Sequence, residues 1–434
     1  MPTRLIEHLS AEAPLHLPLQ RALAGLPPAS RQLLRAVAQQ AEEQELPLYI
    51  VGGFVRDALL GLRSLDLDLV VEGDAIAFGR KLVRQLGGSL QAHKTFGTAV
   101  WTLESASGLP PFVDLISARR EHYAHSGALP TVELSTLRDD QYRRDFTINT
   151  LALRLDGAQA GELHDPFGGL ADLRRGLVRV LHDGSFSDDP TRMFRASRFA
   201  GRLGFRLEGS TSAQLRANLD AIHHVSGERL FNELNLILYE PQRSTILSRL
   251  QARGVLRVVE PGLGFTAGMA AELDAARLPA EGWGLQTDAA ELGWAVWLGQ
   301  LPVETVRQVS QRLRFPRELA TAVTGTASLR TQVRGWLGQP ASALARRLDR
   351  LPLLSIYAAS LLQHSAQASR LLATYARRWR NLHAHTDGDA LKARGIEPGP
   401  AYGRILGALR DAWLDGQVTT VKQEQALLER LLRE

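Results

Sequence analysis

Two short motifs near the start of the chain carry residue types suited to phosphate chemistry. The first places Gly52 and Gly53 directly after the apolar run 48–51. Glycine lets a backbone turn approach a triphosphate closely, because it has no Cβ and accepts positive φ. Arg56, with Asp57 beside it, adds a planar cation that matches phosphate oxygens. The first motif is therefore interpreted as a triphosphate-binding turn.

The second motif supplies paired carboxylates. Asp66 and Asp68 alternate with leucines, and the two-residue period of a strand puts both carboxylates on one face, with Leu65, Leu67 and Leu69 on the other. Two such carboxylates suit magnesium ions, which activate an attacking hydroxyl and neutralise a leaving pyrophosphate. Alone, each motif is more often an ordinary turn or a solvated strand edge. In this order they predict a nucleotidyltransferase site.

A third candidate carboxylate interrupts an apolar segment. Asp114 lies within 112–116, which otherwise reads as a strand. A charge in such a strand is costly unless it is paired or binds a metal. Two roles stay open for Asp114: a third catalytic carboxylate of the metal site, or a structural partner for Arg119 and Arg120.

Two arginine-rich segments follow. Arg143 and Arg144 precede Asp145, an arrangement that binds phosphate or sugar, or else forms a solvated salt-bridge cluster. Further along, Arg192, Arg195 and Arg198 recur every third residue, so they lie along one side of a helix. A solvated basic face is the simpler interpretation of the second set.

The start of that helix adds an acceptor to the arginine row. Pro190 suits a first helical turn, with Asp188 or Asp189 as its N-cap. Asp189 stands three residues before Arg192, so a carboxylate and a forked donor lie together. Such a pair can read the hydrogen-bonding edge of a nucleobase.

The composition limits the possible classes of protein. The chain has 434 residues and no cysteine, which predicts several domains and excludes disulfides and thiolate sites. No apolar run is long enough for a membrane span, and the N-terminus does not resemble a signal peptide. We therefore expect no membrane association and a cytoplasmic location. The pI of about 9.7 comes almost entirely from arginine, which weakly favours a nucleic-acid partner.

Hydrophobic periodicity predicts an α+β fold. Short apolar strands at 48–51, 66–71, 98–103 and 112–116, with a helix at 75–86, form a small α/β block. After about residue 156 helical periodicity dominates, apart from 177–181. Together with the family resemblance that the motifs carry, this order implies five parts: an N-terminal helical extension (1–46), a catalytic head with a mixed sheet (47–155), a neck that recognises the nucleotide base (156–240), a helical body (241–330) and a helical tail (331–434).

In combination, the motifs of residues 50 to 240 resemble one known family. The order Gly-Gly-x-Val-Arg-Asp, Asp-x-Asp, Arg-Arg-Asp-Phe-Thr-Ile-Asn, Asp-Pro-Phe-Gly-Gly and Asp-Pro-x-Arg-x-x-Arg-x-x-Arg-Phe is similar to that of class II tRNA nucleotidyltransferases. That family includes the CCA-, CC- and A-adding enzymes and the bacterial poly(A) polymerases, within the polymerase-β superfamily. One departure is Asp188, which stands where the family usually has Glu.

The resemblance implies a role for each motif. Asp66 and Asp68 would hold Mg²⁺, Asp189 and Arg192 would select the incoming base, and other residues would contact the nucleotide. Those nucleotide-binding residues would be Gly52, Gly53, Arg56, Asp57, Arg144, Arg195 and Arg198. The segment 227–234 resembles the family's neck helix, although Glu228 and Arg229 also read as a plain charge pair within one helix.

The expected reaction adds A or CCA to the 3′ end of tRNA from ATP and/or CTP, without a nucleic-acid template. The 3′ hydroxyl attacks the α-phosphate in line, and pyrophosphate leaves. The segment 122–137 is expected to be the loop that switches between nucleotides. If only A is added, a separate CC-adding enzyme is a partner. Arginines with nearby aromatics in the tail are candidates for the tRNA surface: Arg346, Arg347, Arg377, Arg378 and Arg380.

Two alternatives stay open. A poly(A) polymerase would run the same chemistry on another primer, although the short tail of mixed charge favours the tRNA enzyme. A catalytically silent RNA-binding protein of the same fold is the other. Five separated polar residues argue against a silent protein, because such a protein has no reason to keep them: Arg56, Asp66, Asp68, Asp189 and Arg192.

Overall fold

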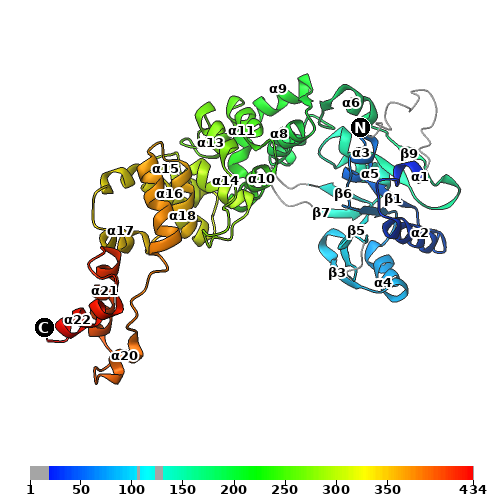
Figure 1. Ribbon diagram of the computed structural model, residues 1–434. Helices are drawn as coiled ribbons and strands as arrows, with labels where there is room; N and C mark the ends of the chain where they lie inside the picture. Colours follow the sequence, from blue (N-terminus) through cyan, green and yellow to red (C-terminus); the bar gives the residue numbers. More distant parts are fainter. Residues whose placement is uncertain (1–18, 105–107, 123–130, 434) are drawn as a thin grey trace. The chain divides into compact units, whose positions relative to one another are not determined.

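The computed structural model describes residues 19–104, 108–122 and 131–433, and the chain divides into two compact units, Met1–Val225 and Ser226–Glu434. Unit 1 carries the sheets, whereas the described part of unit 2 contains only helices (Figure 1). The predicted class, a mixed-sheet head followed by helices, is confirmed. Because the boundary falls inside the range 156–240, the five-part division stays a prediction.

The main sheet of unit 1 has seven strands in the order β3-β4-β5-β2-β1-β8-β9. Only β2 and β5 pair in parallel, and the other neighbours are antiparallel. Two small sheets pair β6 with β7 and β10 with β11. The strands are β1 (Leu48–Val51), β2 (Asp68–Val71), β3 (Ser89–His93), β4 (Thr98–Thr102), β5 (Phe112–Ser117), β6 (Arg119–His122), β7 (Thr131–Leu134), β8 (Ala152–Arg154), β9 (Leu163–His164), β10 (Leu177–Val178) and β11 (Arg206–Leu207).

Helices surround this sheet within unit 1. Asp74 caps α4 by accepting hydrogen bonds from the backbone nitrogens of Ile76 and Ala77, and α4 packs on β4 and β5 with Phe78 and Leu82 in the core. The helices are α1 (Leu19–Ala22), α2 (Pro28–Glu42), α3 (Gly53–Leu59), α4 (Ala75–Leu86), α5 (Leu137–Tyr142), α6 (Gly169–Arg175), α7 (Ser185–Asp188), α8 (Arg192–Arg202) and α9 (Gly209–Ala217).

Unit 2 is built from helix pairs. Trp294 and Trp297 stack with ring centroids 5.4 Å apart, and both are fully buried on α14. The helices are α10 (Gly227–Tyr239), α11 (Arg243–Ala252), α12 (Val255–Val259), α13 (Ala267–Ala275), α14 (Ala289–Leu298), α15 (Val303–Arg312), α16 (Arg317–Gln332), α17 (Ala341–Leu348), α18 (Leu353–Leu361), α19 (Ala366–Thr374), α20 (Gly388–Ala393), α21 (Pro400–Leu414) and α22 (Val421–Leu431). A single π-helical turn, Tyr375–Trp379, follows α19.

Most of the predicted elements of the head are confirmed, and two details are corrected. The second strand begins at Asp68 rather than Asp66, and Leu65 is 49% exposed instead of facing the core with Leu67 and Leu69. Backbone pairing ends at the carboxylates, so Leu65 stands outside the strand alternation. Strands β3, β6, β7, β8, β9 and β11 were not predicted, because each is short or largely exposed and carries little apolar alternation.

The segment 122–137, expected to be a loop, is partly regular. Its described ends belong to the antiparallel hairpin of β6 and β7, in which His122 pairs with Thr131, and Leu137 begins α5. Residues 123–130 lie outside the described residues. The N-terminal extension is helical in α1 and α2, as expected, and its first 18 residues also lie outside the described part.

Candidate active site

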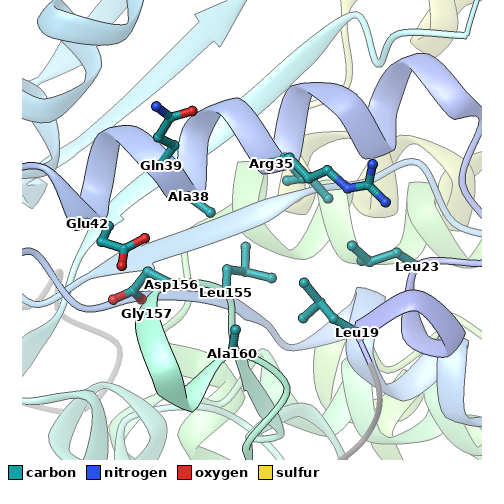
Figure 2. A pocket seen from close by; sticks show the side chains of 11 residues that line it. Leu19, Leu23, Arg35, Ala38, Gln39, Glu42, Leu155, Asp156, Gly157 and Ala160 are labelled. Carbon is teal, nitrogen blue, oxygen red and sulfur yellow. The ribbon is translucent and has the colours of Figure 1, made fainter.

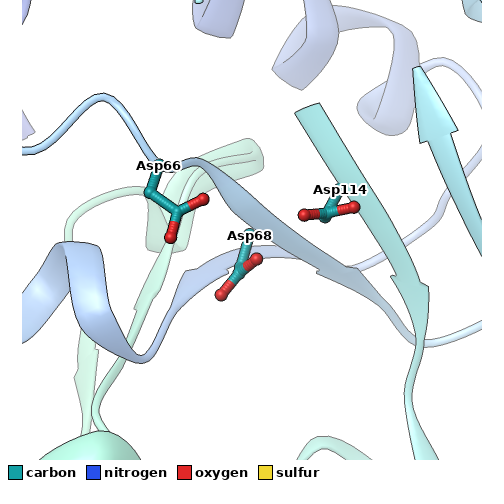
Figure 3. A group of neighbouring side chains, drawn as sticks. All are labelled: Asp66, Asp68 and Asp114. Carbon is teal, nitrogen blue, oxygen red and sulfur yellow. The ribbon is translucent and has the colours of Figure 1, made fainter. Parts of the chain in front are cut away.

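Three carboxylates meet at one end of the parallel strand pair. Asp114 on β5 is in register with Asp68 on β2, and the backbone nitrogen of Asp114 donates to the carbonyl of Leu67 at 3.0 Å. Asp66 lies just before β2. One carboxylate oxygen from each aspartate lies within 4.8 Å of the other two, and Figure 3 shows the three side chains directed into one space. The structure therefore joins the predicted pair to the third candidate.

Asp114 is not the structural partner of Arg119 and Arg120 that the sequence left open. Arg119 donates to Glu121 at 2.7 Å, and Arg120 donates to Asp139 at 2.9 Å. Both guanidinium groups thus have other acidic partners. Asp114 belongs to the carboxylate cluster.

The cluster concentrates negative charge in a partly buried place. Burial raises the pKa of Asp68 to about 6, against the lowering effect of Arg144 and with further raising by the carboxylates of Asp66, Asp114 and Asp140. Burial and the Asp66 carboxylate also raise the pKa of Asp114. Three clustered oxygen donors with this mutual repulsion fit a hard divalent cation, which would stabilise all three ionised forms.

The glycine turn lies against the second arginine of the Arg-Arg-Asp motif. Gly52 has a φ of 68°, and a Cβ on it would stand 2.7 Å from Nη1 of Arg144. Asp140 holds Arg144 by accepting from its Nη2 at 3.0 Å. The backbone turn and the guanidinium therefore present polar groups side by side, close enough to the triad for Arg144 to lower the pKa of Asp68.

Arg56 and Asp57 lie inside the protein rather than at its surface. Each is 3% exposed, and Nε of Arg56 donates to Asp57 at 2.8 Å. Nη1 of Arg56 donates to Asn149 Oδ1 at 2.5 Å, and its guanidinium lies 5.1 Å from the centroid of the Phe199 ring. These contacts make Arg56 a link between α3, the segment after α5 and α8. Its contact with triphosphate stays a prediction.

The arginine row on α8 is not a solvated face. Arg192 is 5% exposed, and its Nη2 donates to the carbonyl of Arg143 at 2.8 Å. Arg195 donates twice to Asp145, at 2.8 and 2.6 Å. Burial alone would raise the pKa of Asp145, but Arg195 and Asn149 outweigh it and hold the pKa below its usual value. The solvated alternative is wrong for these two arginines.

The predicted N-cap of α8 at Asp188 or Asp189 is wrong, because the helix begins at Arg192 after Thr191, which forms no side-chain cap hydrogen bond. Oδ1 of Asp189 accepts from the backbone nitrogen and the hydroxyl of Thr191, at 3.0 and 2.7 Å. The guanidinium of Arg198 lies 5.6 Å from the centroid of the Phe199 ring. Base reading by Asp189 and Arg192 stays a prediction.

Three supporting residues were missed in the sequence. Asp140 is fully buried and accepts from both Arg143 and Arg144. Glu121 pairs with both Arg119 and Arg143, and Asn149 bridges Arg56 and Asp145. The placement of Asp140, three and four residues before two adjacent arginines, was the one available signal.

In unit 2 all five candidate tRNA-binding arginines are exposed. The guanidinium of Arg347 lies 5.4 Å from the centroid of the Trp336 ring, and that of Arg377 lies 5.7 Å from the Trp283 ring. Arg346 donates to Asp411. In the same unit Glu228 pairs with Arg314, which lies outside its helix, at 2.8 Å.

A cavity of about 220 Å³ lies between α2 and the segment 155–160, and none of the three clustered carboxylates lines it (Figure 2). Two acidic residues, Glu42 and Asp156, line it. Asp156 accepts from the backbone nitrogen of Leu48 at 2.7 Å and pairs with Arg154, so its charge is used in contacts with β1 and β8. Within the described residues, the triad is the only cluster of at least three potential metal ligands.

Comparison with known proteins agrees with this geometry. Residues 48–179 match the family model "Poly A polymerase head domain", and residues 204–265 match "Probable RNA and SrmB- binding site of polymerase A". A structure of a CCA-adding enzyme in its apo form II has a TM-score of 0.79 and 31% identity, covering 96% of this chain and 98% of that one.

Relatives define the class further. The chain is 36% identical to an A-adding tRNA nucleotidyltransferase of Geobacter sulfurreducens, over 94% of this chain and 47% of the relative. It is 32% identical to a CC-adding tRNA nucleotidyltransferase of Deinococcus radiodurans, over 94% of this chain and 96% of the relative. The fold and the arrangement of the site thus match those of this class of relatives.

The chain belongs to the tRNA nucleotidyltransferase family. It spans about half the length of the A-adding relatives from Geobacter sulfurreducens and Halalkalibacterium halodurans, at 47% and 56%. No helix within residues 19–104, 108–122 and 131–433 combines the length and apolar character that crossing a membrane requires.

Proposed function

We propose that this chain adds nucleotides to the 3′ end of tRNA from ATP, CTP or both, without a nucleic-acid template. The observation that carries the proposal is the convergence of Asp66, Asp68 and Asp114 beside the turn formed by Gly52 and Arg144. A carboxylate cluster and a phosphate-binding turn are the two parts that nucleotidyl transfer requires.

The triad is proposed to hold Mg²⁺. Carboxylate oxygens are the ligands that this hard cation prefers. Burial and neighbouring carboxylates raise the pKa of Asp68, and a nearby cation would lower it again. A bound divalent cation would neutralise phosphate oxygens and the charge that develops on the attacking 3′ hydroxyl and the leaving pyrophosphate.

The chain's own residues bind and orient the nucleotide in this proposal. The backbone turn at Gly52 and the guanidinium of Arg144 meet the triphosphate, and Asp140 keeps Arg144 in place from behind. Arg192, anchored on the carbonyl of Arg143, and Asp189 read the edge of the base. Because protein groups select the base, no template strand is needed.

Addition of A alone is the subtype that the comparisons favour. Over 94%, 94% and 96% of the chain, identity is 36% to an A-adding relative, 32% to a CC-adding one and 31% to a CCA-adding enzyme. Over 56% and 50% of the chain, it is 42% to a second A-adding relative and 36% to a multifunctional CCA protein. An A-adding enzyme would work with a separate CC-adding partner. We place the activity in the cytoplasm, where a chain without cysteine and with a tRNA substrate fits.

The test is incorporation with magnesium on three RNAs: a tRNA transcript ending at the discriminator base, one ending in C-C, and an unstructured RNA. Each receives ATP, CTP or both. A single A on the C-C end alone supports the A-adding subtype, and C-C followed by A on the first transcript supports CCA addition. Long A tails on unstructured RNA would identify a poly(A) polymerase instead, and no incorporation would contradict the proposal.

A further inference from the structure

A second polar cavity in unit 1 combines an exposed aromatic ring with an arginine of α8. Its volume is about 490 Å³, and its walls include Tyr142, Arg143, His182, Asp188 and Arg192. Cavities of roughly 300–1,000 Å³ hold small-molecule ligands. The volume suits a nucleobase with its sugar.

Tyr142 offers this cavity a flat apolar face. It is the last residue of α5 and is 48% exposed, although two other rings lie against it. Its ring centroid lies 5.2 Å from that of His182, with planes 31° apart, and 5.8 Å from that of Phe167, with planes 39° apart. The neighbouring rings fix the orientation of Tyr142, so little side-chain freedom is lost when a ligand stacks on it.

Arg192 offers the same cavity an edge of hydrogen-bond donors. Its guanidinium is anchored by the carbonyls of Arg143 at 2.8 Å and Ser185 at 3.4 Å. A ligand that contacts both the Tyr142 ring and the Arg192 guanidinium must have a flat aromatic face and hydrogen-bonding atoms along its edge. A nucleobase has both.

We propose that Tyr142 is a stacking platform for the base of the incoming nucleotide and makes the site prefer a purine. A purine covers more of the tyrosine ring than a pyrimidine does, so the platform stabilises bound ATP more than bound CTP. The inference rests on the proposed function and deepens it, since it names a residue that sets the choice between the two nucleotides.

The experiment compares Tyr142→Ala with Tyr142→Phe, which keeps the ring. Removing a stacked aromatic costs about tenfold in affinity. We expect Tyr142→Ala to raise the KM for ATP about tenfold and to weaken calorimetric binding of a CTP analogue less, with the KM for tRNA unchanged. For CTP the binding is measured, because an enzyme that adds only A does not incorporate CTP. Tyr142→Phe should match the wild type. Leu278→Ala, which removes a side chain of similar exposure from the other unit, is the control.

A second measurement separates this inference from the proposed function. Calorimetric binding of a non-hydrolysable ATP analogue, without RNA, should weaken about tenfold in Tyr142→Ala only. If the wild type neither incorporates nor binds nucleotides, the proposed function fails. If the wild type is active but Tyr142→Ala and Tyr142→Phe behave alike, or ATP and CTP are affected equally, the platform is overturned. Thermal unfolding of each variant checks that the fold is kept.

Discussion

Arg195 on α8 and Asp145 are joined by two hydrogen bonds of 2.8 and 2.6 Å, both to the same carboxylate oxygen. The other oxygen of Asp145 accepts from Asn149, whose own side-chain oxygen accepts from Arg56. A continuous polar chain therefore ties α8 to the helix that follows the glycine turn. The helix that carries Arg192 and the turn at Gly52 are held by one network.

Replacing Asp145 with Ala should destabilise unit 1. The substitution leaves Arg195 and Asn149 without their shared acceptor, and breaking a buried ion pair costs about 3–5 kcal/mol. Because the Arg195 side chain is 33% exposed, we expect the lower end, about 3 kcal/mol in the free energy of unfolding by urea.

The control for that measurement is Arg307→Ala, which breaks the surface pair of Arg307 and Glu304. Both of those side chains are well exposed, so the expected change is below about 0.5 kcal/mol. Equal effects of the two substitutions would show that the Asp145 network does not stabilise the fold.

Gly52→Ala should impair both stability and nucleotide binding. The backbone has a φ of 68°, and the new Cβ would clash with Arg144. Strain of this kind costs about 1–3 kcal/mol, and displacing Arg144 should raise the KM for nucleotide. Thermal unfolding and steady-state kinetics measure the two effects.

Gly407→Ala provides the contrast. Gly407 lies within α21, and a Cβ added there would approach no other part of the described structure within 4 Å. Alanine at this position should therefore stabilise the protein by about 0.5–1 kcal/mol. A Gly52→Ala variant as stable and active as the wild type would contradict the role of the turn.

Asp140 gives a pH dependence with a definite sign. Burial acts to raise its pKa, but Arg143 and Arg144 outweigh burial and hold the pKa below its usual value. Its stabilising effect is thus complete above the unfolded pKa of about 3.9 and is lost as the pH falls through the folded pKa. The wild type should exceed Asp140→Asn in Tm at pH 7, and the difference should shrink below about pH 4. A difference that grows on acidification would contradict this sign.

Charge reversal at arginines of unit 2 tests whether they bind tRNA. Reversing charge at Arg347, Arg377 and Arg378 should weaken tRNA binding at least about tenfold and flatten its salt dependence, by about one unit of slope for each phosphate that is no longer neutralised. The KM for nucleotide should stay unchanged. Charge reversal at Arg257, Arg307 and Arg317, which are also exposed, is the matched control, and an equal loss of binding there would mean that only net charge matters.

The carboxylates of the candidate site were largely predictable from local patterns. The spacing of Asp66 and Asp68 pointed to a pair although only Asp68 lies in the strand, and an aspartate inside an apolar strand needs a partner or a metal. The sequence does not specify that β5 lies beside β2, so the role of Asp114 stayed open until the parallel register was known.

Contacts over long sequence distances could not be predicted in the same way. Arg56 meets Asn149 across 93 residues, and the internal bonds of Arg192 depend on how α8 packs near the end of α5. The prediction for Leu65 was wrong because the strand starts later than the alternation of residues suggests. In each case tertiary packing, which a local pattern does not encode, determined the result.

The most direct test of catalysis at the triad is incorporation of labelled AMP into a tRNA ending in C-C, by the wild type and by Asp68→Asn, with tRNA binding measured in parallel. The wild type should add A in the presence of magnesium and stop when EDTA is added. Asp68→Asn should be at least about a hundredfold slower, since loss of metal-assisted charge stabilisation costs several kcal/mol, while tRNA binding stays within about twofold of the wild type. Undiminished incorporation by Asp68→Asn, or none by the wild type, would contradict nucleotidyl transfer at these carboxylates.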